Sequence, residues 1–469
     1  MANQTTLYAM AVVALIIGIA VGYFAGAGNV TTTTVTQTQV QTETQIQTVT
    51  TTVVAGEGEV VTVTKTLPVT TTVTQTQTVQ GEAPAAGLSG EIRIGVLLPL
   101  TGDLASYGEA ARAAALLAEQ DINAWLQAAG APFTVKMVIE DTQTDPTVAQ
   151  QKFDTIVAQG IKFILGPMTS AEVSALKERA DTQQILLISP SSTAPQLAIP
   201  DDFVYRFCPT DLIQGPAIAK VMQADGVEVV IALVRADDWG RGLIESSREA
   251  FLEMVPNGVV EAIEYDPKNP NFAQQVAQLN DLVNRYLGEG KKVGVLLISF
   301  NEAVQVFQQA DQYDTLKQVR WYGSDGTALL SEIVNDPVAG KFAAQVKFIN
   351  PIFAAAKSDK YDDVNMRLTE ELGRVPDTYA FAVYDSAWVV TLALMAVGDY
   401  DPVKVKEILP TTARVFYGTT GEIVLNEAGD RAFADYALWE VVETSPGQYE
   451  WVNVGMYKYA TNSIEWYTG

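Results

Sequence analysis

The chain has 469 residues, of which 48% are hydrophobic and 18% charged, a composition typical of a globular protein with room for two or three domains. Its 30 basic and 55 acidic residues give a net charge of -25, which repels phosphate backbones and argues against a nucleic-acid partner. It has no histidine and a single cysteine, Cys208, which excludes Ser-His-Asp catalysis, histidine metal sites and a disulfide within the chain.

The N-terminal region contains an apolar segment, Leu7 to Phe24, without a charged residue. At about 1.5 Å per residue, a helix of this length can cross the roughly 30 Å core of a bilayer. We interpret residues 1–28 as a single-pass anchor in the cell membrane, with the globular domain that follows on the extracellular side. A cleaved signal peptide is the alternative interpretation, although the first ten residues carry no Lys or Arg and no cysteine follows directly for lipid attachment.

Residues 29–89 consist almost entirely of Thr, Val and Gln. Such a segment has too few large apolar residues to bury a core, so we expect an extended stalk. Asn29-Val30-Thr31 is an acceptor sequence for N-glycosylation. The alternation of Thr with Val or Gln also has the period of a β-strand, so pairing between neighbouring stalks is a second hypothesis.

From Glu91 onward, apolar strand-like runs alternate with helical stretches. IRIGVLLPL is followed by a predicted helix over 109–126, then FTVKMVIED, a helix over 148–159 and FILG. This alternation is typical of βαβ units with a parallel sheet. The pattern continues for roughly 380 residues, more than one core can hold, so the sequence predicts an α/β fold of two lobes.

Short polar and aromatic segments follow most of these strands, where open parallel sheets bind ligands. Taken singly, a serine there is usually a helix N-cap and an aspartate a turn former. Together they suit an α-amino acid: hydroxyls and N–H groups at helix N-termini favour a carboxylate, a buried carboxylate favours an ammonium group, and aromatic rings can line the side chain. The candidates are Tyr107, Ser170, Ser191, Ser192, Thr193, Trp239, Phe300 and Asp325.

The segments IGVLLPLTGDLASYGEAARAAALLAEQDIN, ILGPMTSAEVSA, ILLISPSSTAPQL and DDWGRG resemble the type I periplasmic solute-binding proteins for leucine, isoleucine and valine, and the likeness spans about Glu91 to Val442. The resemblance implies two Rossmann-like lobes with parallel central sheets that close like a Venus flytrap. Lobe I would comprise 91–209 plus 349–433, and lobe II 210–348 plus 434–469. Three hinge crossovers would lie near Pro209, Phe348 and Ala434.

The resemblance also implies a role for each candidate ligand-binding residue. Ser170 and Thr193 match the hydroxyls that hold the ligand carboxylate, and Ser191 and Ser192 would add backbone groups. Asp325 stands at the position where the family has a carboxylate that pairs with the ligand ammonium group, although the family typically has the longer glutamate there. Tyr107 and Trp239 match the two aromatic residues that clamp the ligand, although Tyr is usual in the family at position 239. Phe300 is a looser match to the family's site.

The expected function is therefore that of an extracytoplasmic solute-binding subunit of an ABC transporter, which captures an amino acid of the branched-chain type. Its partners would be a membrane permease and its ATPase, and no cofactor or metal is expected. A ligand sensor for amides or other small polar solutes and a cell-surface structural or assembly protein on the same scaffold are the alternative hypotheses. An enzyme is the least supported reading, because histidine and a cofactor fingerprint are absent from the sequence.

Overall fold

The computed structural model describes residues 34–55, 59–80 and 87–467, and the chain divides into two compact units, Met1–Gly87 and Leu88–Gly469. In the first unit, β1 (Thr34–Ala55) pairs antiparallel with β2 (Glu59–Gln80) along the full 22 residues of each strand. The Thr/Val/Gln segment thus forms its strand pairing within one chain. The expected anchor over Leu7–Phe24 lies outside the described residues.

The second unit consists of two α/β lobes, as the sequence predicted. Lobe I has a six-stranded parallel sheet in the order β15-β7-β6-β5-β3-β4. These strands are β3 (Gly90–Leu98), β4 (Phe133–Asp141), β5 (Phe163–Leu165), β6 (Leu186–Ser189), β7 (Val204–Pro209) and β15 (Asp430–Arg431). The other elements of this lobe are α1 (Ala105–Ala128), α2 (Pro146–Val157), α3 (Ser170–Gln183), η1 (Pro195–Leu197), α10 (Asp359–Leu372), α11 (Thr378–Val397), α12 (Pro402–Val415), β13 (Tyr417–Gly418) and β14 (Gly421–Glu422).

Both faces of the lobe I sheet are covered, which explains why its strands are apolar throughout. On β3, Val96 and Leu98 belong to the core cluster shared with α1, whereas Leu97 packs with Phe153 and Ile156 of α2. Helix α1 packs against α10 and α11, and α2 packs against α3. The carboxyl ends of the strands remain free to carry the loops that face lobe II.

Lobe II has an eight-stranded sheet in the order β18-β17-β16-β12-β11-β10-β8-β9. Its strands are β8 (Val229–Arg235), β9 (Val259–Tyr265), β10 (Val293–Ile298), β11 (Arg320–Tyr322), β12 (Ile349–Phe353), β16 (Tyr436–Ser445), β17 (Gln448–Lys458) and β18 (Ser463–Trp466). Its helices are α4 (Asp211–Ala224), α5 (Asp238–Met254), α6 (Phe272–Gly288), α7 (Ala303–Ala310), η2 (Leu316–Gln318), α8 (Ser331–Asn335), α9 (Pro337–Gln345) and η3 (Tyr459–Thr461).

The sheet of lobe II is parallel at its centre, as expected, and antiparallel at one end. Strands β8 to β12 are parallel, but β12, β16, β17 and β18 pair antiparallel. Strands β16 and β17 are joined by a tight turn at Gly447, which has a φ of +73°, and β17 and β18 by the short η3. Such short links build antiparallel hairpins, since a parallel pair needs a long crossover.

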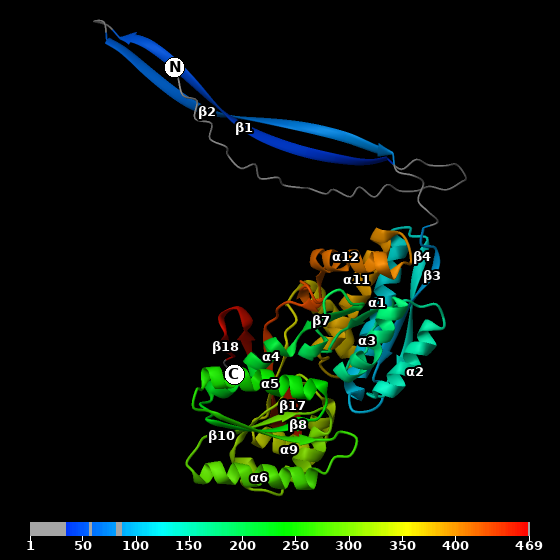
Figure 1. Cartoon of the computed structure of the whole chain (residues 1–469), viewed down its shortest axis with the longest axis vertical. Coiled ribbons are helices and arrows are strands. Elements are labelled where there is room, and N and C mark those ends of the chain that lie inside the picture. Colours follow the sequence, from blue (N-terminus) through cyan, green and yellow to red (C-terminus); the bar gives the residue numbers. More distant parts are fainter. Residues whose placement is uncertain (1–33, 56–58, 81–86, 468–469) are drawn as a thin grey trace. The chain divides into compact units, whose positions relative to one another are not determined.

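The chain passes between the lobes after β7, after β12 and after β15, so each lobe is discontinuous in sequence. Figure 1 shows this in its colours, with cyan and orange segments together in lobe I and green, yellow and red segments together in lobe II. The second crossover was expected near Phe348. It lies instead beyond Phe353, because β12 is hydrogen-bonded within the lobe II sheet to β11 and β16.

Helix α11 is long and apolar enough to span a membrane by length and composition alone. In the described protein, however, 72% of its most apolar window is buried inside the fold. It begins with the Asp377 side chain accepting from the N–H groups of Tyr379 and Ala380, and ends at Gly398 with a φ of +70°. It is therefore a core helix of lobe I, and its first turn reaches the boundary between the lobes.

Candidate functional site

A small cavity between the lobes brings together six of the residues selected from the sequence. Lobe I contributes Tyr107, Ser170 and Ser191 to its wall, and lobe II contributes Trp239, Phe300 and Asp325. The remaining wall is formed by Leu104, Met168, Thr169, Gly326 and Tyr379. Ser192 and Thr193 lie directly behind this wall, and both are almost completely buried.

The hydroxyl-rich side of the cavity lies at the N-terminus of α3. Thr169 caps this helix through a capping box with Glu172, which places Ser170 in the first turn. The Ser170 hydroxyl accepts hydrogen bonds from the Ser192 hydroxyl at 3.0 Å and from the Ala194 N–H at 3.1 Å. The Thr193 hydroxyl is buried and has no hydrogen-bond partner within residues 87–467. The helix end and its hydroxyls favour an anion here.

A buried ion pair holds the loop that carries these serines. The Arg206 side chain contacts Asp430 through two N–H···O bonds of 2.5 and 2.8 Å, and both residues are buried. The same guanidinium donates to the carbonyls of Ser192 and Ala194 at 3.2 and 2.7 Å. Because β7 and β15 are paired through this contact, the position of the loop depends on a strand from the far end of the chain.

Asp325 supplies a buried carboxylate on the opposite side of the cavity. Its Oδ2 accepts a 2.5 Å hydrogen bond from the Tyr379 hydroxyl, while its Oδ1 has no partner in the described part of the chain. The Asp325 N–H donates to Gln214 Oε1 at 2.9 Å, and the Gln214 amide donates to Asp211 at 3.1 Å. Burial raises the pKa of the Asp325 carboxyl to about 6. A cation that donates a hydrogen bond to Oδ1 would give the second oxygen of this buried carboxylate its partner.

The aromatic wall of the site comes from lobe II. Trp239 and Phe300 are stacked, with ring centroids 4.7 Å apart and an interplanar angle of 19°. The Arg235 guanidinium lies over the Phe300 ring, 4.4 Å from its centroid. Position 326 has to be glycine, because an added Cβ would lie 2.5 Å from the Trp239 ring. These rings, with Leu104 and Met168, give the cavity an apolar side suited to an aliphatic side chain.

The lobes are closed on each other around this cavity. The Tyr107 hydroxyl of lobe I donates to the carbonyl oxygens of Asp325, at 2.7 Å, and Ala328 in lobe II. The Ser106 hydroxyl donates to Glu332 at 2.8 Å, and Arg235 pairs with Asp103 at 3.1 Å. The enclosed volume is about 20 Å³. That space holds about one water molecule, so a solute has to enter while the lobes are apart.

Sequence reasoning missed Tyr379, which lines the cavity and bonds to the central carboxylate. It was missed because the search was confined to residues that follow strands, whereas Tyr379 lies in the first turn of α11. The signal was present as Pro376-Asp377, a helix start two residues before an aromatic residue. No group of three or more residues able to hold a metal ion is found among the described residues.

Comparison with known proteins matches residues 91–446 to the periplasmic binding protein family. An uncharacterized protein of Methanocaldococcus jannaschii is 33% identical over 393 residues, covering 80% of this chain and 91% of the relative. The leucine-, isoleucine-, valine-, threonine-, and alanine-binding protein of Pseudomonas aeruginosa is 24% identical over 74% of this chain and 89% of its own. The crystal structure of a leucine-binding protein from Thermotoga maritima superposes with a TM-score of 0.64 at 20% identity, covering 77% and 97% of the two chains.

Proposed function

Because the chain belongs to the periplasmic binding protein family, we propose that its interlobe cavity, opened beyond the 20 Å³ of this closed form, captures a single α-amino acid of the branched-chain type. The observation that carries the proposal is the opposition of Asp325, with a free Oδ1, to the hydroxyls at the N-terminus of α3. A buried carboxylate on one lobe and an anion-binding helix end on the other match the two charged ends of an amino acid.

In the proposed complex the ligand carboxylate lies against Ser170 and the loop 191–193, and its ammonium group lies against Asp325. Tyr107, Trp239 and Phe300 then surround the aliphatic side chain. Since the two ends are held by different lobes, the ligand stabilises the closed form through contacts that the open form lacks. A relative that binds leucine, isoleucine, valine, threonine and alanine supports this ligand class.

The proposal extends to the setting of the protein. Residues 1–28 would tether the chain to the membrane, and the segment 29–89 would hold the lobes on the extracellular side. The closed, loaded protein would then deliver its amino acid to a membrane permease driven by a cytoplasmic ATPase. The relatives from Pseudomonas aeruginosa and Thermotoga maritima are binding proteins, which supports a non-enzymatic role of this kind.

The test is calorimetric titration of the full chain with each of the common amino acids, alongside Asp325→Asn. Leucine, isoleucine or valine is expected to bind, and Asp325→Asn to weaken binding by about a hundredfold or more, since a charge-assisted contact of roughly 3 kcal/mol is lost. Asp238→Asn is the matched control, because Asp238 is an exposed aspartate beside Trp239 in the first turn of α5. Equal affinities of the two variants would refute the role given to Asp325.

A further inference from the structure

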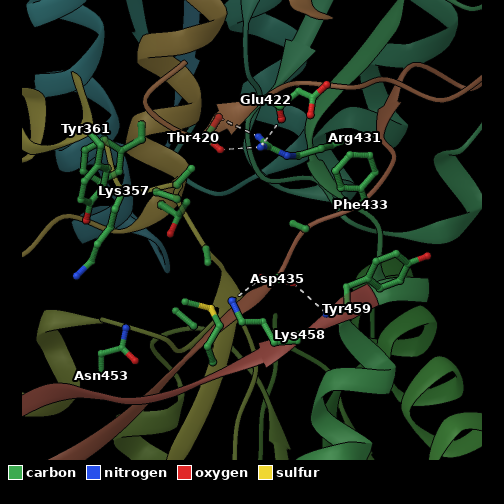
Figure 2. Close-up of a pocket in the computed structure, with 18 of the residues that line it drawn as sticks. Lys357, Tyr361, Thr420, Glu422, Arg431, Phe433, Asp435, Asn453, Lys458 and Tyr459 are labelled. Atoms are coloured by element: carbon green, nitrogen blue, oxygen red, sulfur yellow. Dashed lines mark hydrogen bonds and ion pairs between the residues drawn. The ribbon is translucent and has the colours of Figure 1, made fainter. Parts of the chain in front are cut away.

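A second and much larger cavity lies between the lobes at the hinge, with a volume of about 950 Å³. Its floor is formed by the second and third crossovers, 354–357 and 433–435. Lobe I supplies Tyr361, Thr420 and Arg431 to its walls, and lobe II supplies Trp439, Asn453 and Lys458 among others. In Figure 2, Arg431 and Thr420 lie across this hinge cavity from Lys458 and Asp435.

The first turn of α11 separates the hinge cavity from the candidate amino acid site. Thr378 and Phe381 line the hinge cavity, whereas Tyr379 lines the small cavity and bonds to Asp325. The two cavities therefore share one structural wall while having different lining residues. An occupant of the hinge cavity would contact both lobes without entering the amino acid site.

The hinge cavity contains a buried guanidinium, that of Arg431, which forms no direct ion pair with the described residues. Arg431 is 5% exposed and donates to the Thr420 hydroxyl, the Thr420 carbonyl and the Glu422 carbonyl at 2.7 to 2.8 Å, none of which is a carboxylate. Its Nε has no partner within the described ranges. Partial compensation comes from the buried Asp385 carboxylate, which accepts from the same Thr420 hydroxyl at 2.6 Å, and from the Phe353 ring, whose centroid is 5.4 Å away. A buried cation of this kind favours a nearby anion.

Two lysines and several exposed rings complete the lining. Lys357 is exposed, and Lys458 pairs with Asp435 at 3.0 Å. Phe433 and Tyr459 are each 44% exposed although they are large and apolar. Exposed apolar side chains gathered around one concave surface commonly mark a binding site. Basic side chains combined with exposed aromatic rings suit a molecule that has one negative charge and an apolar body.

We propose that the hinge cavity is a second ligand site, which takes a small organic carboxylate with an aromatic or aliphatic body. The carboxylate lies toward Lys357 in the positive field of Arg431, and the apolar body packs on Phe433 and Tyr459. Because the floor is made of the crossover segments, an occupant is coupled to lobe closure, and this coupling acts in both directions between the two sites. The proposal is independent of which solute the amino acid site takes.

The experiment titrates the full chain in lipid nanodiscs with phenylacetate, against empty nanodiscs and against the neutral phenylacetamide. Binding of one phenylacetate per chain is expected with a Kd of about 1 mM or tighter. Lys357→Gln should weaken it about two- to fivefold, the range of a solvent-exposed ion pair. Lys341→Gln is the matched control, since Lys341 is an exposed lysine on α9 outside the cavity lining.

A blocking variant keeps the test independent of charge. Ala460 is exposed and lines the hinge cavity, so Ala460→Trp should remove phenylacetate binding without disturbing the core. The proposal is overturned if phenylacetate and phenylacetamide bind equally, if the two lysine variants behave alike, or if Ala460→Trp binds as the unmodified chain does. Amino acid titrations of the same samples report on the other site, so failure at one site is distinguishable from failure at the other.

Discussion

The Tyr379 hydroxyl of lobe I donates a 2.5 Å hydrogen bond to the Asp325 carboxylate of lobe II. In the closed protein this phenol takes one of the two carboxylate oxygens and leaves Oδ1 for an ammonium group. The contact therefore links the lobes beside the proposed ligand and orients the carboxylate that would hold it.

Tyr379→Phe should weaken binding of the amino acid. The phenol of lobe I holds Oδ2 of Asp325 in lobe II and leaves Oδ1 for the ammonium group, so phenylalanine removes a bond of the closed form without freeing the oxygen that the ligand uses. A hydrogen bond of this kind is worth roughly 1 kcal/mol, so a loss of about fivefold is expected. Isothermal titration measures it, and a gain of affinity would instead show that the phenol competes with the ligand for the carboxylate.

Binding should weaken as the pH falls through the pKa of Asp325. Burial raises the pKa of the free carboxyl to about 6, and a bound ammonium group would lower it, so binding releases a proton in the window below pH 6. The Kd should be constant above about pH 7 and rise about tenfold per unit well below 6.

The Tyr379 hydrogen bond lowers the pKa of Asp325, so the midpoint of this profile should move upward in Tyr379→Phe. Titrations between pH 4.5 and 8 in buffers of different ionisation enthalpy would record both the affinity and the proton released. A profile with no slope across this range would show that Asp325 does not titrate in the free protein.

Ser106→Ala should shift the protein toward its open form. The Ser106 hydroxyl of lobe I donates to Glu332 of lobe II at 2.8 Å, and the Ser331 hydroxyl donates to the same carboxylate at 3.2 Å from within lobe II. Only the first bond crosses between the lobes. Loss of about 1 kcal/mol from the closed form predicts roughly fivefold weaker ligand binding for Ser106→Ala, with Ser331→Ala close to the unmodified chain. Small-angle scattering of ligand-free samples would report the change in opening.

Asp430→Asn should destabilise the fold by about 3 to 5 kcal/mol, because it leaves Arg206 buried without its counter-charge. Asp154→Asn removes the partner of Arg179 in an exposed pair and should cost about 1 kcal/mol or less. Urea unfolding measures both. Since Arg206 also holds the carbonyls of Ser192 and Ala194, ligand affinity should fall in the first variant and not in the second.

Much of the fold could be read from the sequence because buried parallel strands are continuous apolar runs. FTVKMVIED coincides with β4, and IRIGVLLPL overlaps β3. The antiparallel end of lobe II was not foreseen, since β17 alternates exposed and half-buried residues along most of its length and resembles none of those runs. The second crossover was misplaced because its position came from the resemblance, and the short run INPIF, with its Asn and Pro, does not show by its pattern which sheet it joins.

The candidate site was predictable to the extent that strand ends converge on one edge of a sheet. That rule selected Tyr107, Ser170, Trp239 and Asp325, which the structure brings around one cavity. It could not select Tyr379, whose place beside Asp325 depends on how two lobes close. Contacts between separately folded sheets leave no periodic signal in the chain that makes them.

The scattered origin of each lobe has a consequence for the order of synthesis. The edge strand β15 of lobe I and the antiparallel end of lobe II both come from residues after 429. A ribosome that has made most of the chain has therefore finished neither sheet, and strands β7 and β12 still present open edges to which other chains can pair. Neither sheet can be completed before these residues are made, so a chain that ends before Asp430 should have two incomplete domains instead of one intact lobe and one damaged one.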